Sequence, residues 1–364
     1  MKKLSVLAAV LCFASPSAYA DITIGLAGPL TGQYANFGEQ FRRGAEQAVS
    51  DINAKGGIHG EKIALRIVDD ACDPKQAVTA ANQLASAGVK YVVGHFCSGS
   101  SIPASKVYAE ESIVMISPAS TNPSLTDAGL KNVFRICGRD DQQGVVQANY
   151  IMKHFPGKRI AVIHDNTTAG KGQADVFKKT LNDAGIKEVL YDAYVPGQKD
   201  YGALISKLKS SQVEVLDIGG YHTEAGLITR QIKEQGAKIQ IIGGDALVTN
   251  ELWSITGPAG EGLLMSFQPD ARNIPAAKAS TEAMRKGGYE PEGYTLYTYA
   301  ALQVIAEAIK RAGKDPVKVA ESLKSEPAQT IIGTIGFNEK GDVKGSNYVI
   351  YQWHDGKYAE VAKK

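Results

Sequence analysis

Residues 63–101 read IALRIVDDACDPKQAVTAANQLASAGVKYVVGHFCSGSS, and this stretch decides the fold class. Two short apolar runs, 63–70 and 91–96, flank a longer amphipathic stretch, which predicts a strand, a helix and a second strand. Pro74 suits the first turn of that helix, and Asp73 before it suits the N-cap. This alternation predicts a βαβ unit, whose two strands run parallel in one sheet.

Apolar runs of strand length recur from one end of the chain to the other, separated by longer amphipathic stretches. The candidate strands are 22–28, 63–70, 91–96, 114–119, 159–165, 213–220, 239–245, 263–267 and 347–353. One apolar face at helical spacing is formed by Phe41, Ala45, Ala48, Val49 and Ile52. Gly56-Gly57 then ends that helix.

The strands fall into two series, one before about residue 138 and the other from about 159 to 267. A chain of 364 residues exceeds what one hydrophobic core usually serves. The segment 270–347 is mostly helical and too poor in strands to form a third domain, so it should complete the first lobe. We therefore predict an α/β protein of two doubly wound parallel-sheet lobes and a hinge that the chain crosses three times. Lobe 1 comprises 21–139 with 269–348, and lobe 2 comprises 140–268 with 349–364.

The first 20 residues are typical of a secretory signal peptide. Lys2 and Lys3 precede an apolar run, and Ala18-Tyr19-Ala20 predicts cleavage after Ala20. A lipoprotein anchored through Cys12 is the alternative, but Leu11 stands where a small residue would be expected. We therefore expect an exported, periplasmic protein.

The charge balance argues against nucleic acid and anionic membrane surfaces as partners. The chain has 40 basic and 38 acidic residues, and loss of Lys2 and Lys3 with the signal leaves 38 of each.

Three cysteines remain after cleavage, and two of them follow predicted strands. Cys72 and Cys97 should therefore emerge at the same edge of a parallel sheet, which makes them the favoured disulfide pair in an oxidising compartment. Cys137 is then left over. A metal site is the weaker alternative, because no two of these cysteines have Cys-x-x-Cys spacing.

Signals for metal binding and catalysis are poor. Asp69, Asp70 and Asp73 cluster, but no glycine-turned ligand loop follows, so we interpret the first two as solvated acids at a strand end. The pair His164-Asp165 lacks an accompanying nucleophile motif, which favours a structural histidine. We expect no metal, no cofactor and no enzymatic activity.

The carboxyl ends of the predicted strands are rich in glycine, hydroxyls and amides, with few charges. Ligands of open parallel sheets bind beyond these ends, and such groups suit a small polar ligand. The stretch GLAGPLTG at 25–32 lacks both the Gly-x-Gly-x-x-Gly spacing and a Gly-Lys-Ser/Thr ending, which argues against nucleotide binding.

Six stretches in order carry a resemblance to a known family. They are INAKGGIHGEKI (52–63), DDACDPKQA (69–77), YVVGHFCSGSSIPAS (91–105), MISPASTNP (115–123), GQKDYGALISKLK (197–209) and IGFNEKGDVKG (335–345). The sequence resembles the leucine/isoleucine/valine-binding proteins of branched-chain amino-acid ABC transporters. This resemblance implies a type I periplasmic-binding fold, a disulfide between Cys72 and Cys97, and delivery of ligand to a membrane permease. We expect a monomer.

The resemblance implies that the ligand carboxylate is held by Ser98 and by the loop Ala119-Ser120-Thr121. The CSGSS stretch at 97–101 begins a predicted helix, whose N-terminal amides favour an anion, in agreement with this role. A plain N-cap for Ser98 and a turn position for Thr121 are the structural alternatives.

The resemblance implies that the ligand ammonium meets Asp245, with Tyr221 touching it or forming a wall. The family usually has glutamate at the position of Asp245, so the shorter side chain here would act through water or at another closing angle. The alternatives are an exposed loop acid and an aromatic residue packed at the lobe edge.

The side-chain pocket departs from the family pattern. Phe37 keeps an apolar wall, Tyr294 takes the place of another pocket aromatic, and Ala169 stands where the family often has tyrosine. A wider pocket would accept ligands beyond leucine, isoleucine and valine.

We therefore predict capture of an amino acid, aliphatic or branched-chain, by closure of the two lobes. A binding protein for another small amino acid and an amino-acid or amide-sensing domain are the alternatives. An enzyme using the same site would need a base-activated nucleophile, which the sequence does not offer.

Overall fold

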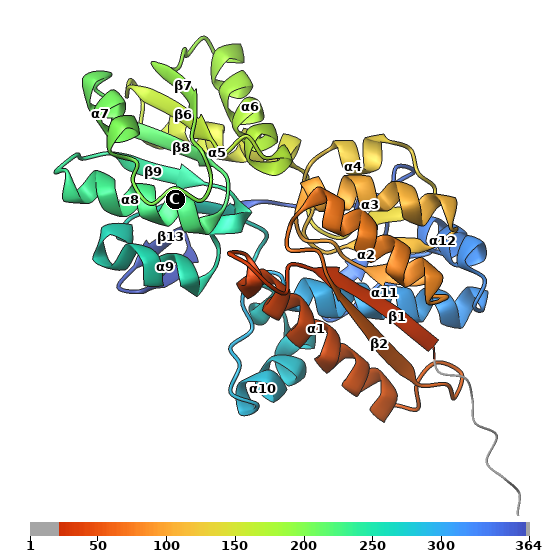
Figure 1. The fold of residues 1–364 in the computed structure, drawn as a ribbon. Coiled ribbons are helices and arrows are strands. Elements are labelled where there is room, and N and C mark those ends of the chain that lie inside the picture. Colours follow the sequence, from red (N-terminus) through yellow and green to blue (C-terminus); the bar gives the residue numbers. More distant parts are fainter. Residues whose placement is uncertain (1–21, 362–364) are drawn as a thin grey trace, which may run out of the picture.

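Two sheets organise the computed structural model, which describes residues 22–361. Each sheet is covered by helices and forms the centre of one of two lobes that lie side by side (Figure 1). The fold class predicted from the sequence is confirmed. The predicted signal peptide, residues 1–20, lies outside the described residues.

The first sheet has five parallel strands in the order β2-β1-β3-β4-β5. They are β1 (Ile22–Gly28), β2 (Ile63–Asp69), β3 (Tyr91–Val93), β4 (Val114–Ser117) and β5 (Val133–Arg135). The helices that connect them are α1 (Ala35–Ala54), α2 (Pro74–Ser86), α3 (Ser98–Glu110) and α4 (Ser124–Asp127). As predicted, α2 begins at Pro74, and the Asp73 side chain accepts hydrogen bonds from the backbone N–H groups of its first turn.

The second sheet has seven strands in the order β14-β13-β10-β9-β8-β6-β7. They are β6 (Ile160–His164), β7 (Leu190–Ala193), β8 (Val215–Gly219), β9 (Gln240–Gly243), β10 (Leu264–Phe267), β13 (Val349–His354) and β14 (Lys357–Glu360). The helices of this lobe are α5 (Asp140–His154), α6 (Thr168–Asp183), α7 (Gly202–Ser210), α8 (His222–Glu234) and α9 (Asn250–Thr256). Strands β6 to β10 are parallel, whereas β13 is antiparallel to both β10 and β14.

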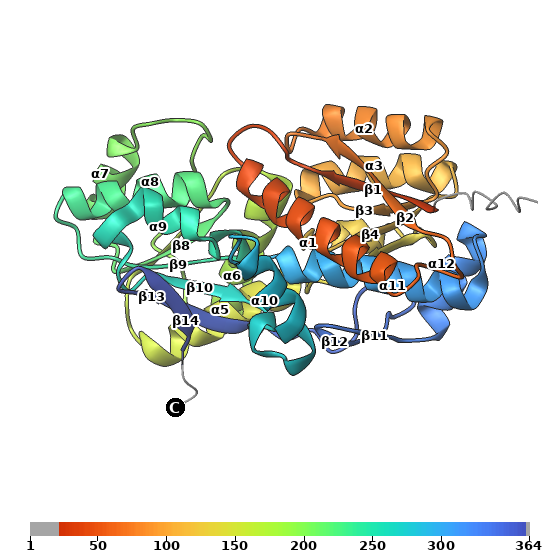
Figure 2. The ribbon, with the colours of Figure 1, turned by 90° about the horizontal axis from the view of Figure 1, so that it is seen from below.

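The segment between β10 and β13 packs against the first sheet and its helices. It contains α10 (Lys278–Lys286), α11 (Thr295–Ala312), α12 (Pro316–Ser325) and the small hairpin β11 (Ala328–Thr330) with β12 (Gly333–Ile335). Helix α11 packs along α1 and against β3, and α12 packs against β4 (Figure 2). The chain therefore passes three times between the two lobes.

All nine predicted strands exist, with ends within three residues of those predicted. The run 91–96 ends early, at Val93, because Gly94 leaves the sheet with φ 145° and lies against the carbonyl oxygen of Ala27. Strands β5, β7, β11, β12 and β14 were missed. Each has only three or four residues, and β7, β12 and β14 are mostly half-buried or exposed, so they lack the apolar run that marks the equally short β3, β4 and β10.

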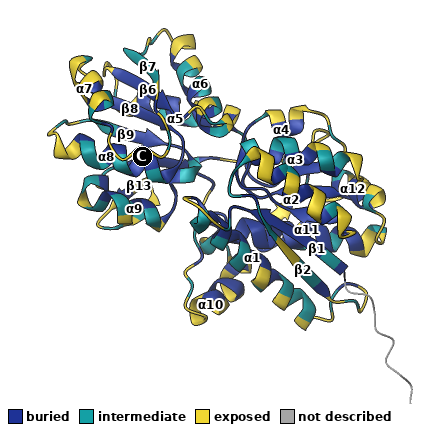
Figure 3. Cartoon of the chain, in the orientation of Figure 1, coloured by how far each residue is buried: buried dark blue, intermediate teal, exposed yellow. Residues whose placement is uncertain are grey.

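Both faces of the central strands of each sheet are buried under helices, whereas the edge strands β2, β7 and β14 are partly exposed (Figure 3). In the first lobe, Ile24 and Val93 belong to one apolar cluster, which includes residues of α1 and α11. Val92 on β3 and Met115 on β4 belong to a second cluster with residues of α2 and α3. Strands covered on both faces read as continuous apolar runs, which is why the sequence revealed them.

A disulfide joins Cys72 to Cys97, with 5.5 Å between their Cα atoms. Strands β2 and β3 both flank β1, so the residues after them meet at one edge of the sheet, as predicted. Cys137 is the free cysteine of the described residues and is completely buried. Burial raises the pKa of its thiol, which keeps it protonated.

The interpretation of Asp70 as a solvated acid is wrong. Asp70 is completely buried, and its Oδ2 atom lies 2.5 Å from Nδ1 of His95, whose Nε2 atom lies 3.0 Å from the hydroxyl of Tyr108. Its Oδ1 atom accepts the backbone N–H of Cys72 at 2.8 Å. Asp69, half-buried at the strand end, accepts a hydrogen bond from the backbone N–H of Leu30. The sequence pattern could not show that β3 would bring His95 beside Asp70.

None of the helices between residues 22 and 361 is long and apolar enough to span a membrane.

We predict that Cys137 resists alkylation by iodoacetamide in the native protein and reacts only after unfolding, since its thiol is buried and protonated. Peptide mass mapping without reduction should recover Cys72 joined to Cys97. A linked peptide containing Cys137, or its rapid labelling in the native state, would contradict the arrangement.

We predict that Asp70→Ala lowers the free energy of unfolding by about 3 kcal/mol, because it leaves buried donors on His95 and Cys72 without an acceptor. Asp73→Ala is the matched control, and loss of its exposed N-cap should cost about 1 kcal/mol. Urea denaturation of the three proteins measures both values. Equal losses for the two variants would show that the buried contacts of Asp70 add nothing.

Candidate functional site

Two loops at the carboxyl edge of the first sheet bring Ser98 and Ala119-Ser120-Thr121 together. They follow β3 and β4, which are neighbours in the sheet. The Oγ atom of Ser98 accepts the backbone N–H of Asn122 at 3.2 Å, and both loops are buried. The N-cap position of α3 belongs to Cys97, so the alternative of Ser98 as a plain N-cap is wrong. Ser98 instead joins the helix start to the second loop.

The side chain of Ser120 is engaged within the protein. Its Oγ atom lies 2.6 Å from Oγ of Ser101 and 2.9 Å from the carbonyl oxygen of Phe96. Thr121 faces the start of α5 instead: its carbonyl accepts the N–H of Asp140 at 3.0 Å, and its hydroxyl lies beside the Asp140 carboxyl, on whose pKa it has a lowering effect.

The second lobe contributes Tyr221 and Asp245 from the ends of neighbouring strands. Tyr221 lies between β8 and α8, and Asp245 begins a short 3₁₀ turn after β9. Tyr221 is buried and Asp245 is half-buried. Their positions follow from the same parallel-strand geometry as those in the first lobe.

Hydrogen bonds join the two lobes at or beside these residues. The hydroxyl of Tyr294, which precedes α11, donates to Oδ2 of Asp245. Asn36 donates to Oγ1 of Thr249 at 2.6 Å. On the other side, Asn122 donates to the carbonyl of Thr168 at 2.8 Å. The two lobes are therefore in contact, and one of these three hydrogen bonds joins Tyr294 to Asp245.

Aromatic rings line this interface. Phe37 stacks on Phe96 with ring centroids 4.0 Å apart, and Tyr34 packs on Tyr221 at 4.5 Å. The ring of Tyr294 meets the edge of Phe96 at 5.7 Å. Phe96 and Tyr34 were missed by the sequence analysis. The available signal for Phe96 was its place between a strand and the helix start of Ser98.

Ala169 lies in the first turn of α6 and is partly buried against the main apolar cluster. Its methyl group is the whole side chain at a position where the resemblance implies tyrosine in other members. The missing tyrosine side chain would therefore have stood beside Thr168, at the interface between the lobes.

A second acid that the sequence analysis missed lies at this interface. Asp140 is the first residue of α5 and 1% exposed, and its Oδ2 atom is buried without a partner among the described residues. Burial and the charge of Asp245 raise the pKa of Asp140 to about 8, and burial raises the pKa of Asp245 to about 6. Two carboxyl groups in this setting favour a cationic group between the lobes.

The other polar groups singled out from the sequence do not form a reactive arrangement. His164 is buried, packs on Tyr191 with ring centroids 5.1 Å apart, and accepts the N–H of Asn166 at 3.2 Å, in keeping with a structural role. In the described chain, the group with metal-binding potential is Glu261, His354 and Asp355. These side chains are exposed: His354 and Asp355 lie at the turn between β13 and β14, and Glu261, which precedes β10, pairs with His354, as does Asp355.

Comparisons with known proteins agree with this geometry. A family model described as periplasmic binding protein matches residues 21–357. The chain is 52% identical to Leu/Ile/Val-binding protein homolog 1 of Brucella suis over 357 residues, which cover 97% of this chain and 96% of the relative. It is also 52% identical to an amino acid binding protein of Pseudomonas aeruginosa, covering 95% of this chain and 94% of the relative.

Solved structures give the same result. A leucine-binding protein from Thermotoga maritima superposes with a TM-score of 0.86 at 28% identity and covers 94% of this chain and 98% of its own. A branched-chain amino acid transporter substrate-binding protein from Streptococcus pneumoniae, in complex with isoleucine, also has a TM-score of 0.86, at 25% identity, with 94% and 99% covered. The chain therefore belongs to the periplasmic binding protein family, in the group of the Leu/Ile/Val-binding protein homologues.

Proposed function

We propose that this protein captures a small aliphatic or branched-chain amino acid between its two lobes and delivers it to the membrane permease of an ABC importer. The observation that carries the proposal is the meeting of a polar loop pair on one lobe with an acid on the other. In support, Ser98 accepts the backbone N–H of Asn122 on the first lobe, Tyr294 of the first lobe donates to Asp245 of the second, and the rings of Phe96 and Tyr221 pack across the interface. A zwitterion with an apolar side chain complements all three features.

In this proposal the first lobe binds the ligand carboxylate. The hydroxyls of Ser98 and Thr121 and the backbone of Ala119 and Ser120 act with the N-terminal amides of α3, where partial positive charge favours an anion. Asp245 and Tyr221 of the second lobe meet the ammonium. Phe37 and Tyr294 form the walls around the side chain, and Ala169 leaves room on the side of the second lobe.

The hydrogen bond from Tyr294 to Asp245 fits this role. A buried carboxylate is costly without a donor, so the tyrosine hydroxyl serves as a partner that an ammonium can replace. Because Asp245 is one methylene shorter than glutamate, we propose a contact through water or a different closing angle.

We propose lobe boundaries at residues 139/140, 268/269 and 348/349, where the chain leaves one sheet for the other. Closure would then be a rotation about these three connections, the hinge type of domain motion. We further propose a monomeric, periplasmic protein that is cleaved after Ala20 and performs no chemistry on its ligand.

We predict that binding is coupled to closure, because the carboxylate and ammonium contacts come from different lobes. After verified removal of co-purified ligand, small-angle scattering should show a smaller radius of gyration on addition of L-leucine, L-isoleucine or L-valine. An unchanged radius at a saturation proven by calorimetry would mean that binding does not close the lobes.

We predict that Asp245→Asn lowers the affinity for L-leucine about 10- to 100-fold, since it removes the charge of a buried, charge-assisted hydrogen bond. Affinity for 4-methylpentanoate, which has no ammonium, should fall much less. Asp192→Asn, an exposed second-lobe acid paired with Lys207, is the matched control and should leave both affinities unchanged.

The wild-type affinity for leucine should also fall as the pH drops below about 6, because the carboxyl of Asp245 becomes protonated there. Calorimetry with both ligands and all three proteins measures these effects. Equal losses for leucine and 4-methylpentanoate would place Asp245 outside the site.

A further inference from the structure

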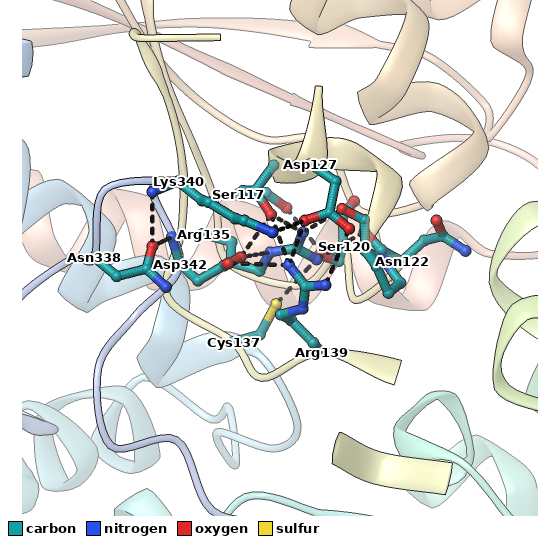
Figure 4. A network of polar contacts seen from close by, with 12 residues as sticks. Ser117, Ser120, Asn122, Asp127, Arg135, Cys137, Arg139, Asn338, Lys340 and Asp342 are labelled. Atoms are coloured by element: carbon teal, nitrogen blue, oxygen red, sulfur yellow. Dashed lines mark hydrogen bonds and ion pairs between the residues drawn. The ribbon is translucent and has the colours of Figure 1, made fainter. Parts of the chain in front are cut away.

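A fully buried guanidinium lies beneath the loop that follows β4. The side chain of Arg135, at the end of β5, is 0% exposed. Its Nη1 atom donates to the carbonyl oxygens of Ser120 at 2.8 Å and of Asn122 at 2.9 Å. These two carbonyls stand on either side of Thr121 in the chain. Figure 4 shows Arg135 between this loop and the segment that carries Asp342.

The direction of one backbone N–H follows from this contact. In a trans peptide the C=O and N–H bonds point in opposite directions. Since the carbonyl of Ser120 points to Arg135, the N–H of Thr121 in the same peptide unit points away from it. Arg135 thereby orients a backbone donor of the loop that we propose for the ligand carboxylate.

Asp342 neutralises and orients the guanidinium. Its Oδ1 atom accepts from Nε of Arg135 at 2.7 Å and from Oγ1 of Thr126 at 2.6 Å. Thr126 in turn accepts from Nη2 of Arg135 at 2.5 Å. Removing one partner of such a buried pair leaves a charge without compensation, which is strongly unfavourable.

Through Arg135, Asp342 links the loop of Thr121 to two of the three connections between the lobes: the one at Arg139 and the one on which Asp342 itself lies. Its Oδ2 atom accepts from Nη1 of Arg139, the N-cap residue of α5, at 3.0 Å. Asp342 itself lies in the segment that leads from β12 into β13. This segment is held to β5 by backbone hydrogen bonds from Arg135 to Gly341 at 2.9 Å and from Val343 to Arg135 at 3.1 Å.

Gly341 shows how closely the two segments approach. Its φ is 94°, and a Cβ atom there would lie 2.1 Å from the carbonyl oxygen of Val133. The segment therefore cannot move relative to β5 without breaking the contacts of Asp342.

We propose that Arg135 is a positioning residue for ligand binding: it orients the Ser120–Thr121 peptide toward the ligand carboxylate, and Asp342 holds Arg135 in place from the connection to β13. The inference rests on the proposed function for the identity of the ligand. The orientation of the loop by Arg135 can be tested without any ligand.

The first test compares Arg135→Lys and Asp342→Asn with Asp127→Asn. A lysine keeps the charge, but a single ammonium group lacks the fork that donates in several directions at once. Asp127 is the matched control, because it pairs with Arg139 and Lys340 in the same network but does not contact Arg135. Far-ultraviolet circular dichroism and thermal melting confirm that each variant is folded.

Calorimetry with L-leucine and with 3-methylbutylamine, which lacks the carboxylate, then separates positioning from general damage. Both test variants should lose about 10-fold or more in affinity for leucine and much less for the amine, whereas Asp127→Asn should change neither. Equal losses for the two ligands in both test variants, or no loss for leucine, would overturn the proposal.

Hydrogen exchange of the ligand-free proteins gives a second, independent readout. The amides of residues 119–122 should exchange about 10-fold faster or more in Arg135→Lys and Asp342→Asn than in the wild type and in Asp127→Asn. Unchanged exchange in folded variants would overturn the proposal, even if the amine binds too weakly to measure. If the wild type binds neither leucine nor another amino acid, the proposed function fails, and this exchange result still decides the role of Arg135.

Discussion

Parallel strands all end at the same edge of their sheet, and the organisation of this protein depends on that constraint. In the first lobe it brings Cys72 beside Cys97 and Ser98 beside the loop of Thr121. In the second lobe it places Tyr221 and Asp245 on neighbouring strand ends. Because the two edges face each other, residues far apart in the chain become one surface. The helices that link the strands cover the faces and leave these edges free for binding.

The electrostatics of this interface are asymmetric. On the first lobe the buried cation, Arg135, is held by Asp342 and by backbone carbonyls, so its charge is satisfied before any ligand arrives. On the second lobe, Asp140 has a buried carboxyl oxygen that is without a partner among the described residues. Asp245 accepts a hydrogen bond from the hydroxyl of Tyr294. One side thus presents neutral and amide donors, and the other presents acids whose pKa values are raised by burial. A zwitterion satisfies both sides at once.

Residues whose roles follow from local pattern were predicted well. The helix of Pro74 with its cap and the disulfide depend on the order of residues along one βαβ unit, and each of the nine predicted strands depends on a local apolar run. The interpretation of Asp70 as a solvated acid was wrong for a definite reason. An acid at a strand end is normally solvated, and only the path of Gly94 after β3 brings His95 and Tyr108 to enclose it. Phe96 and Asp140 were missed in the same way, because their neighbours at the interface come from other strands and from the second lobe.

By itself the sequence determined the fold class, the two series of strands, the cysteine pair and, through resemblance, the set of loops that should meet a ligand. These properties depend on periodicity, on turn residues and on motifs within short stretches of chain. How the loop is held became visible only in three dimensions: Arg135 from β5 contacts the carbonyls on either side of Thr121, and Asp342 from the last connection holds Arg135, although more than 200 residues separate Arg135 from Asp342. The physical reason is that a buried charge needs a partner at hydrogen-bond distance, and sequence patterns do not record which distant segments will supply it.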